Sequence, residues 1–164
     1  MKYTPKDGFP YYFELASDDN LQSIFVDNSA LLFFQSIDEA KLALRYQPGK
    51  WTIKQVIGHI TDHERIKMFR AFQLSRNEQV ELWGYDQEFL VKNSRFNDLS
   101  KQLLLDDYQN VKRASQSFVK TLSDSQLQIK GRAREHEISL EEFLRSIIGH
   151  ERHHVHMIRS KYHI

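Results

Sequence analysis

Histidines gather at the C-terminal end of the sequence, in IIGHERHHVHMIRSKYHI, where five of the eight fall within the last fifteen residues. Imidazole binds divalent metal ions, and histidine also favours the C-terminal end of a solvated helix because of the helix dipole. On a helix, His150 and His154 share the face that carries the apolar residues Phe143, Ile147 and Ile158. His153 and His156 fall off this face. We therefore expect His150 and His154 to point inward, as a chelating pair or as hydrogen-bonded core histidines.

A second His-x-x-x-His spacing, His59 and His63, occurs earlier in GHITDHER. A glycine precedes the histidine in both GHITD and GHERH. Glycine inside a helix costs about 1 kcal/mol relative to alanine, so Gly58 and Gly149 indicate either a close approach of helices around a shared site or easier packing at each position alone. We expect His59 to be a third ligand. His63 is a fourth ligand, a residue that supports a ligand, or an exposed side chain.

Three histidines that leave one coordination position open are typical of catalytic rather than structural metal sites. Water or substrate takes the open position, where the ion lowers the pKa of bound water or polarises a bound group. Asp62, Glu64 and Glu151 lie next to the histidines in sequence. They are candidates to orient imidazoles or to move protons, with ordinary surface carboxylates as the alternative.

The composition excludes several other classes of protein. The sequence has no cysteine, which excludes disulfides, a cysteine nucleophile and thiolate zinc sites. Lys and Arg number 23 against 22 Asp and Glu, so the net charge of +1 argues against a nucleic-acid-binding protein. The basic run KGRAREH, Lys130 to His136, is predicted to be a solvated turn.

Neither a signal peptide nor an apolar stretch near the ~20 residues of a membrane span is found. We expect a cytoplasmic protein that does not contact membranes.

Four amphipathic segments predict the elements that must position these side chains. The length of 164 residues predicts one domain spanning 1–164, and a hydrophobic content of 40% predicts that it is globular. Thr52 with Gln55 and Ser139 with Glu142 form capping boxes, the signature of a helix start. The predicted fold class is all-α, a four-helix bundle with long helices over 19–36, 52–75, 100–122 and 139–161, and a short helix over 86–92.

An aromatic connector joins the second and third predicted long helices and contains Trp83, Tyr85 and Phe89. Connectors of this length in small domains are often functional. It is long enough to fold back across the mouth of the bundle, where the three rings would form a substrate pocket. Alternatively, the rings only cap the core.

The segments YQPGKWTIKQVIGHITDHE and SLEEFLRSIIGHERHHVHMI, with WGYDQEFL between them, resemble the DinB/YfiT-like superfamily of small metalloenzymes. The resemblance implies an up-down-down-up four-helix bundle that binds one divalent ion, such as zinc or nickel, through His59, His150 and His154. It also implies that members often form homodimers. Related YfiT-like proteins are thiol S-transferases that use bacillithiol or mycothiol, and others are related to maleylpyruvate isomerases.

The first hypothesis is therefore a metal-dependent thiol S-transferase whose partners are small-molecule electrophiles and a low-molecular-weight thiol. A metal-dependent hydrolase is an alternative, because bound water is also a nucleophile. A non-catalytic, stress-response metal-binding protein is a further alternative.

Overall fold

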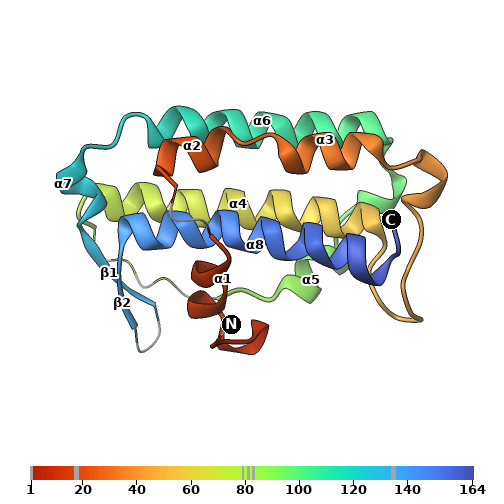
Figure 1. The fold of residues 1–164 in the computed structure, drawn as a ribbon, viewed down its shortest axis with the longest axis horizontal. Helices are drawn as coiled ribbons and strands as arrows, with labels where there is room; N and C mark the ends of the chain where they lie inside the picture. The colour runs from red at the N-terminus through yellow and green to blue at the C-terminus, as the bar shows by residue number, and fades with distance from the viewer. Residues whose placement is uncertain (1, 17–18, 79, 81, 83, 134–135) are drawn as a thin grey trace.

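The computed structural model describes residues 2–16, 19–78, 80, 82, 84–133 and 136–164. Three long helices, α4 (Ile53–Ser75), α6 (Lys101–Val119) and α8 (Leu140–Lys161), pack with a broken fourth, α2 (Leu21–Val26) and α3 (Ser29–Ser36) (Figure 1). The broken helix and α8 run one way along the bundle, and α4 and α6 run the other way (Figure 1). The predicted up-down-down-up four-helix bundle is confirmed.

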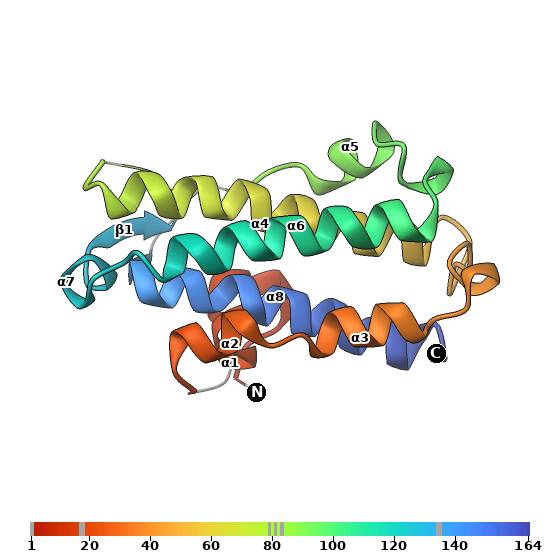
Figure 2. The same cartoon turned by 90° about the horizontal axis from the view of Figure 1, so that it is seen from above.

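The starts of the long helices follow the capping signals in the sequence. The Thr52 and Ser139 side chains accept from the backbone N–H groups of Gln55 and Glu142, and both capping boxes are complete. Ser100 caps α6 in the same way. The connector after α4 carries the short helix α5 (Gln87–Lys92), which contacts α4 and lies beside it (Figure 2). This connector returns the chain along the bundle, so that α6 starts near the start of α4.

The prediction of one continuous helix over 19–36 is wrong, because the helix breaks at Asp27 and Asn28. The Asp27 carboxylate accepts from the backbone N–H and the hydroxyl of Ser29, at 2.8 and 3.0 Å. Such side chains compete with the helical hydrogen bonds of the backbone. The apolar spacing continues across the break, since Ile24 and Leu31 are both buried, and periodicity alone therefore gave no sign of it.

The return from α6 to α8 contains a short helix, α7 (Asp124–Leu127), and an antiparallel hairpin of β1 (Lys130–Ala133) and β2 (His136–Ser139). The prediction of a solvated turn over Lys130 to His136 is wrong at both ends, because Lys130–Ala133 form β1 and His136 begins β2. Ala133 and Ile138 are buried against the end of the bundle, and this burial holds the hairpin in place.

An N-terminal helix that the sequence did not predict, α1 (Phe9–Leu15), packs on α8 (Figure 1). It explains Gly149, where a Cβ atom would lie 1.7 Å from the Tyr12 carbonyl oxygen. At Gly58 a Cβ would lie 2.5 Å from the ring of Phe96 in the 3-10 helix η3 (Phe96–Asp98). Both glycines mark close approaches, and the elements that approach them are α1 at Gly149 and η3 at Gly58, rather than the other histidine-bearing helix.

The core divides into two apolar clusters along the bundle. One contains Phe143, Leu144 and Ile147 of α8, and the other contains Ile53 and Ile57 of α4. Between them, α4 and α8 bury polar side chains instead: His59, His63, Glu64, His150, Glu151 and His154. Among the described residues, none of the helices is both long and apolar enough to cross a membrane.

Replacing Gly149 by alanine tests the close approach of α1. Alanine is a better helix former than glycine by about 1 kcal/mol, so Gly149→Ala would stabilise the protein if nothing lay close to this position of the helix. Here the obstacle is backbone, and we expect Gly149→Ala to lower the urea midpoint and to expose α1 to hydrogen exchange. Gly58→Ala, which meets only a side chain, should cost less. A higher urea midpoint for Gly149→Ala would contradict this packing.

Candidate metal centre

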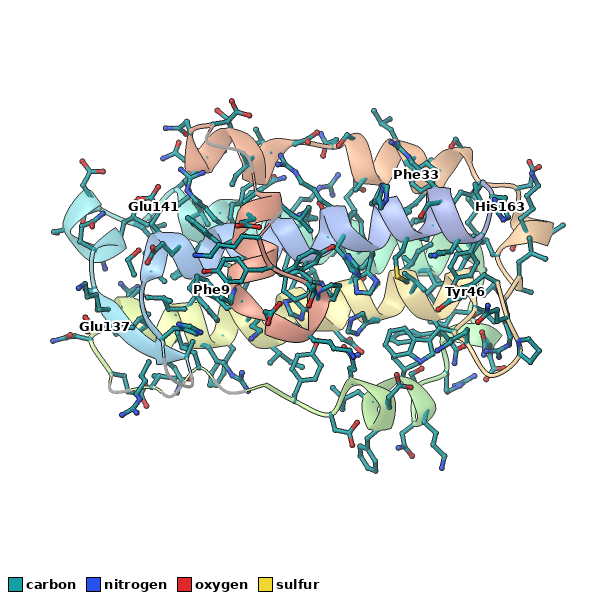
Figure 3. All side chains as sticks on the ribbon, turned by 60° about the horizontal axis from the view of Figure 1, so that its bottom comes forward. Phe9, Phe33, Tyr46, Glu137, Glu141 and His163 are labelled. Atoms are coloured by element: carbon teal, nitrogen blue, oxygen red, sulfur yellow. The ribbon has the colours of Figure 1, made fainter. Side chains whose placement is uncertain are left out.

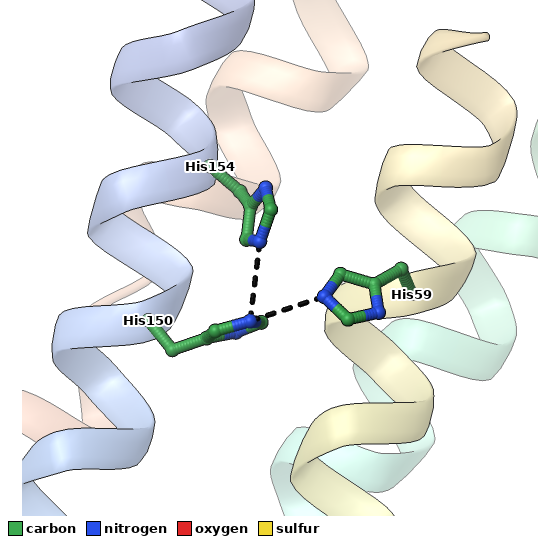
Figure 4. A group of neighbouring side chains, drawn as sticks. All are labelled: His59, His150 and His154. Carbon is green, nitrogen blue, oxygen red and sulfur yellow. Dashed lines mark hydrogen bonds between the residues drawn. The ribbon is translucent and has the colours of Figure 1, made fainter. Parts of the chain in front are cut away.

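Three buried histidines from two helices converge in the polar layer of the bundle (Figure 4). The Nε2 atom of His150 lies 3.1 Å from Nε2 of His59 and 3.1 Å from Nε2 of His154. The three ligand atoms all lie within 4.8 Å of one another. The structure therefore brings together the three residues that the sequence proposed as ligands.

Hydrogen bonds cannot satisfy this arrangement of nitrogens. A neutral imidazole Nε2 either donates one proton or accepts one, but not both. The Nε2 of His150 therefore bonds one neighbour and leaves the other contact unsatisfied. Burial makes that unsatisfied contact costly because water does not replace it. A cation between the three atoms removes the conflict, because it accepts all three lone pairs.

The spacing also fits a metal ion. Zinc–nitrogen bonds of about 2.05 Å in a tetrahedral site place the ligand nitrogens roughly 3.3 Å apart, close to the 3.1 Å found twice here. The Nδ1 atom of His154 is buried and has no hydrogen-bond partner among the described residues. A ligated Nε2 would place the proton on Nδ1, for which no acceptor is described. The triad is suitable for a divalent metal ion.

The histidines are held in the neutral form that ligates metals. Burial, with a smaller effect from His153, lowers the pKa of His59 to about 4. Burial is also the main cause that lowers the pKa values of His150 and His154 well below the ordinary value. At neutral pH all three nitrogens therefore have lone pairs available without the loss of a proton.

His63 is buried beside the triad but lies outside the group of converging ligand atoms. Its ring stacks on that of His150, with centroids 3.6 Å apart and planes 8° apart. Its Nδ1 lies 2.8 Å from the Tyr85 hydroxyl. Of the three roles open to it from sequence, the geometry matches the residue that supports a ligand.

Two aromatic rings that the sequence analysis did not assign also border the triad. The Tyr12 ring of α1 contacts His150 edge-on, with centroids 5.1 Å apart. Trp51 precedes Thr52, the N-cap of α4, and the centroid of its ring lies 4.8 Å from that of the His59 ring. The dense aromatic run FPYYF before the first predicted helix was the available signal for Tyr12.

A cavity of about 540 Å³ reaches this cluster from the side of α1 and the hairpin. His63 and His150 line it together with Tyr12, Tyr85 and Phe143. Figure 3 looks onto this side of the molecule, with Phe9 of α1 labelled; Phe9 also lines the cavity. The cavity gives a small molecule a route to the neighbourhood of the triad.

The aromatic connector supplies one residue of this cavity. Tyr85 lines it and bonds His63. Phe89 is 61% exposed and borders a second cavity, with Trp51 and Lys92, instead. The remaining predicted pocket residue, Trp83, lies outside the described residues.

The other predicted polar residues are not among the converging ligands, although the His153 ring meets the His154 ring edge-on, with centroids 5.0 Å apart. His153 is partly buried, and its Nδ1 lies 2.9 Å from the Tyr11 hydroxyl, while His156 is exposed. Asp62 pairs with Arg65 at 3.1 Å.

Glu64 and Glu151 pair with a buried lysine that the sequence analysis missed. The Lys112 ammonium of α6 lies 3.3 Å from a Glu64 oxygen and 2.8 Å from a Glu151 oxygen. The Tyr108 hydroxyl donates to the same Glu151 oxygen at 2.5 Å. The suggested roles in orienting imidazoles or moving protons therefore find no support in these contacts. A lysine four residues after Tyr108, on the apolar face of α6, was the available signal for this network.

Electrostatics keep the lysine of this network charged. Burial alone would lower the pKa of the Lys112 ammonium, but Glu151 and Glu64 raise it to about 12. Burial raises the pKa of the Glu64 carboxyl, with Lys112 opposing that shift. The network links α6 to the two helices that carry the histidines.

Comparison with known proteins agrees with the fold. The sequence profile of the DinB superfamily matches residues 26–158, which include all three converging histidines. Among solved structures, the chain is similar to YfiT from Bacillus subtilis, described as a probable metal-dependent hydrolase with an unusual four-helix bundle topology. The TM-score is 0.68 at 18% identity, over 94% of this chain and 86% of that chain. No curated protein sequence matches.

Replacing Lys112 by an uncharged residue tests the network that it forms with Glu64 and Glu151. We expect Lys112→Met to lower the free energy of unfolding by about 3–5 kcal/mol, because two carboxylates lose their shared partner inside the protein. Adding Glu64→Gln and Glu151→Gln to this variant should recover part of the loss. Urea unfolding measures both, and a loss below about 1 kcal/mol for Lys112→Met, the range of exposed pairs, would contradict the burial of this network.

The depressed histidine pKa values predict a pH-dependent stability for the metal-free protein. The unfolded chain takes up protons below about pH 6.5, whereas native His59 resists them down to about pH 4. Stability is therefore full above pH 6.5 and is lost as pH falls toward 4, by about 1.4 kcal/mol per pH unit for each such histidine. Urea midpoints between pH 7.5 and 4.5 measure this slope. His59→Gln should flatten it and the exposed His156→Gln should not; equal slopes would contradict the assignment.

Proposed function

The chain belongs to the DinB superfamily, and we propose that it is an enzyme that depends on one divalent metal ion held by His59, His150 and His154. The observation that carries this proposal is the convergence of three buried Nε2 atoms that hydrogen bonds cannot satisfy. Three protein ligands leave a position open, as catalytic rather than structural sites do. The cavity beside His150 supports access of a small molecule to that position.

We propose thiol transfer to a small electrophile as the reaction. When bound, a divalent ion lowers the pKa of a coordinated thiol or water and so supplies a nucleophile at neutral pH. In the transfer, the thiolate sulfur forms a bond to the electrophilic carbon, the leaving group departs with the bonding electrons, and the thiol proton goes to solvent. The described residues place no carboxylate among the converging nitrogens, and a thiol, being much more acidic than water, has less need of a general base.

The protein residues around the triad would bind and orient the reactants. Tyr12 and Trp51 border two of the ligand rings and would shield the reacting atoms from water. Burial raises the pKa of the Tyr85 phenol, which keeps it neutral and able to donate a hydrogen bond. His63 accepts or donates at that hydroxyl, at 2.8 Å, and fixes its position at the cavity wall.

Hydrolysis is the second candidate, and one observation favours it: the fold matches YfiT, described as a probable metal-dependent hydrolase. The same open position would then activate water. The identity of the ion, with zinc and nickel as the candidates, a homodimeric state and a cytoplasmic location remain predictions. A non-catalytic metal-binding role is what remains if neither reaction is found.

Metal content tests the centre directly. Purified, reconstituted protein should hold close to one divalent ion per chain by elemental analysis, and His150→Ala should hold almost none. His153→Gln is the matched control on the same helix, because His153 bonds the Tyr11 hydroxyl through Nδ1 and is not among the three converging ligands, and it should keep the ion. Absence of metal from the wild type, or loss with His153→Gln and not with His154→Gln, would contradict the assignment.

A paired assay tests the reaction. Metal-loaded and metal-stripped protein are given a bimane electrophile with bacillithiol, mycothiol or glutathione, and separately an activated ester without thiol. We expect metal-dependent transfer with at least one thiol, and a lower rate for Tyr85→Phe at unchanged metal content. Metal-dependent ester cleavage without thiol transfer would support the hydrolase instead. If removal of the metal reduces neither thiol transfer nor ester cleavage, the proposal of a metal-dependent enzyme is contradicted.

A further inference from the structure

The N-terminal helix α1 places one tyrosine beside the candidate metal centre. At Gly149, the residue before His150, a Cβ atom would lie 1.7 Å from the Tyr12 carbonyl oxygen, so the two backbones touch at this point. The Tyr12 ring meets the His150 ring edge-on, with centroids 5.1 Å apart, and lines the cavity of about 540 Å³. Backbone packing on α8 therefore fixes where Tyr12 stands relative to a ligand of the centre.

The hydroxyl of Tyr12 is available to a molecule in this cavity. Two other tyrosine hydroxyls near the histidines are already engaged. Tyr11 Oη lies 2.9 Å from His153 Nδ1, and Tyr85 Oη lies 2.8 Å from His63 Nδ1. No described residue bonds the Tyr12 hydroxyl, and its oxygen is not among the fully buried polar atoms without a partner.

This hydroxyl is a hydrogen-bond donor at neutral pH. Burial, with a smaller effect from Tyr11, raises the pKa of the Tyr12 phenol, so the group keeps its proton. A phenol with a proton and no partner in the protein donates to an oxygen atom brought next to it. A donor that is fixed before the reaction stabilises negative charge that develops on such an oxygen.

We infer that Tyr12 donates a hydrogen bond to an oxygen atom of the substrate, so that the cavity selects electrophiles in which the reaction places negative charge on oxygen. Enones and epoxides belong to this class, and alkyl halides do not. The inference rests on the proposed function in one respect, that the occupant of the cavity is the electrophile of thiol transfer.

The enone benzalacetone illustrates the step. The thiolate sulfur forms a bond to the β-carbon, and the electron pair of the C=C bond moves to give an enolate whose charge lies mainly on the carbonyl oxygen. Tyr12 donates to that oxygen. The α-carbon then takes up a proton from solvent, which received one from the thiol, and the product is a neutral thioether.

Two neutral probes test the hydrogen bond apart from the reaction. α-Methylstyrene has the shape of acetophenone but carries a CH₂ group in place of the carbonyl oxygen. NMR titration would measure both affinities, with the protein as purified and after a chelator has removed metal. We expect Tyr12→Phe to weaken acetophenone binding about two- to tenfold in both preparations, the effect of one hydrogen bond, and to leave α-methylstyrene binding unchanged.

Tyr11→Phe is the matched control, because it makes the same chemical change one residue away. Tyr11 is not among the described lining residues of the cavity, so this variant should change neither affinity. The infrared spectrum of bound, carbonyl-labelled acetophenone needs no variant. In the wild type, the carbonyl stretch should lie at the lowered frequency of a hydrogen-bonded carbonyl, with and without metal.

Activity then tests the choice of electrophile. Tyr12→Phe should slow metal-dependent thiol transfer to benzalacetone at least about tenfold, and should change transfer to a bimane halide much less. An equal effect on both electrophiles would refute the selection. If the wild type transfers thiol to neither, the proposed function fails, and the binding of the two probes still decides whether Tyr12 is a donor.

Four results would overturn the role of Tyr12 as a donor. These are no binding of acetophenone to the wild type, full acetophenone affinity in Tyr12→Phe, an equal loss of affinity for α-methylstyrene, and a lowered carbonyl frequency only when metal is bound. The last result would mean that the ion, rather than Tyr12, contacts the oxygen.

Discussion

The structure depends on one constraint: three imidazoles meet inside the bundle at distances that hydrogen bonds cannot satisfy. Two Nε2 contacts of 3.1 Å share the single nitrogen of His150. Buried polar groups without partners cost free energy, so an ion bound between the three nitrogens would stabilise this layer. Apolar clusters lie on either side of the layer, built around Phe143 and Ile57. Their burial offsets the cost of the polar layer.

The polar layer has two sides with different tasks. The histidines of α4 and α8 face α1, Trp51 and the connector, where a cavity opens. The neighbouring residues Glu64 and Glu151 point instead to Lys112 on α6. Buried ion pairs are weak evidence for stability, but they fix a geometry because every misplacement leaves a charge without a partner. Adjacent positions on the same two helices therefore hold the helices in place and present the ligands.

Local signals in the sequence were enough for most of the frame. Capping boxes at Thr52 and Ser139, and the spacing of His150 and His154, depend on neighbours within one or two helical turns. What the sequence did not show depends on distant contacts. The break at Asp27 replaces one local hydrogen-bond pattern by another without changing the apolar spacing. The position of α1, the reason for Gly149 and the partner of Lys112 are set by residues far away in the chain, which a single sequence does not bring together.

Anomalous diffraction tests the central claim most directly. Crystals of the protein grown with zinc would be measured on both sides of the zinc absorption edge. The account predicts one strong anomalous peak inside the bundle, about 2.0–2.1 Å from the Nε2 atoms of His59, His150 and His154, with a fourth position filled by water or another small ligand. A peak only at surface residues such as His156, with the three rings turned away from one another, would contradict it.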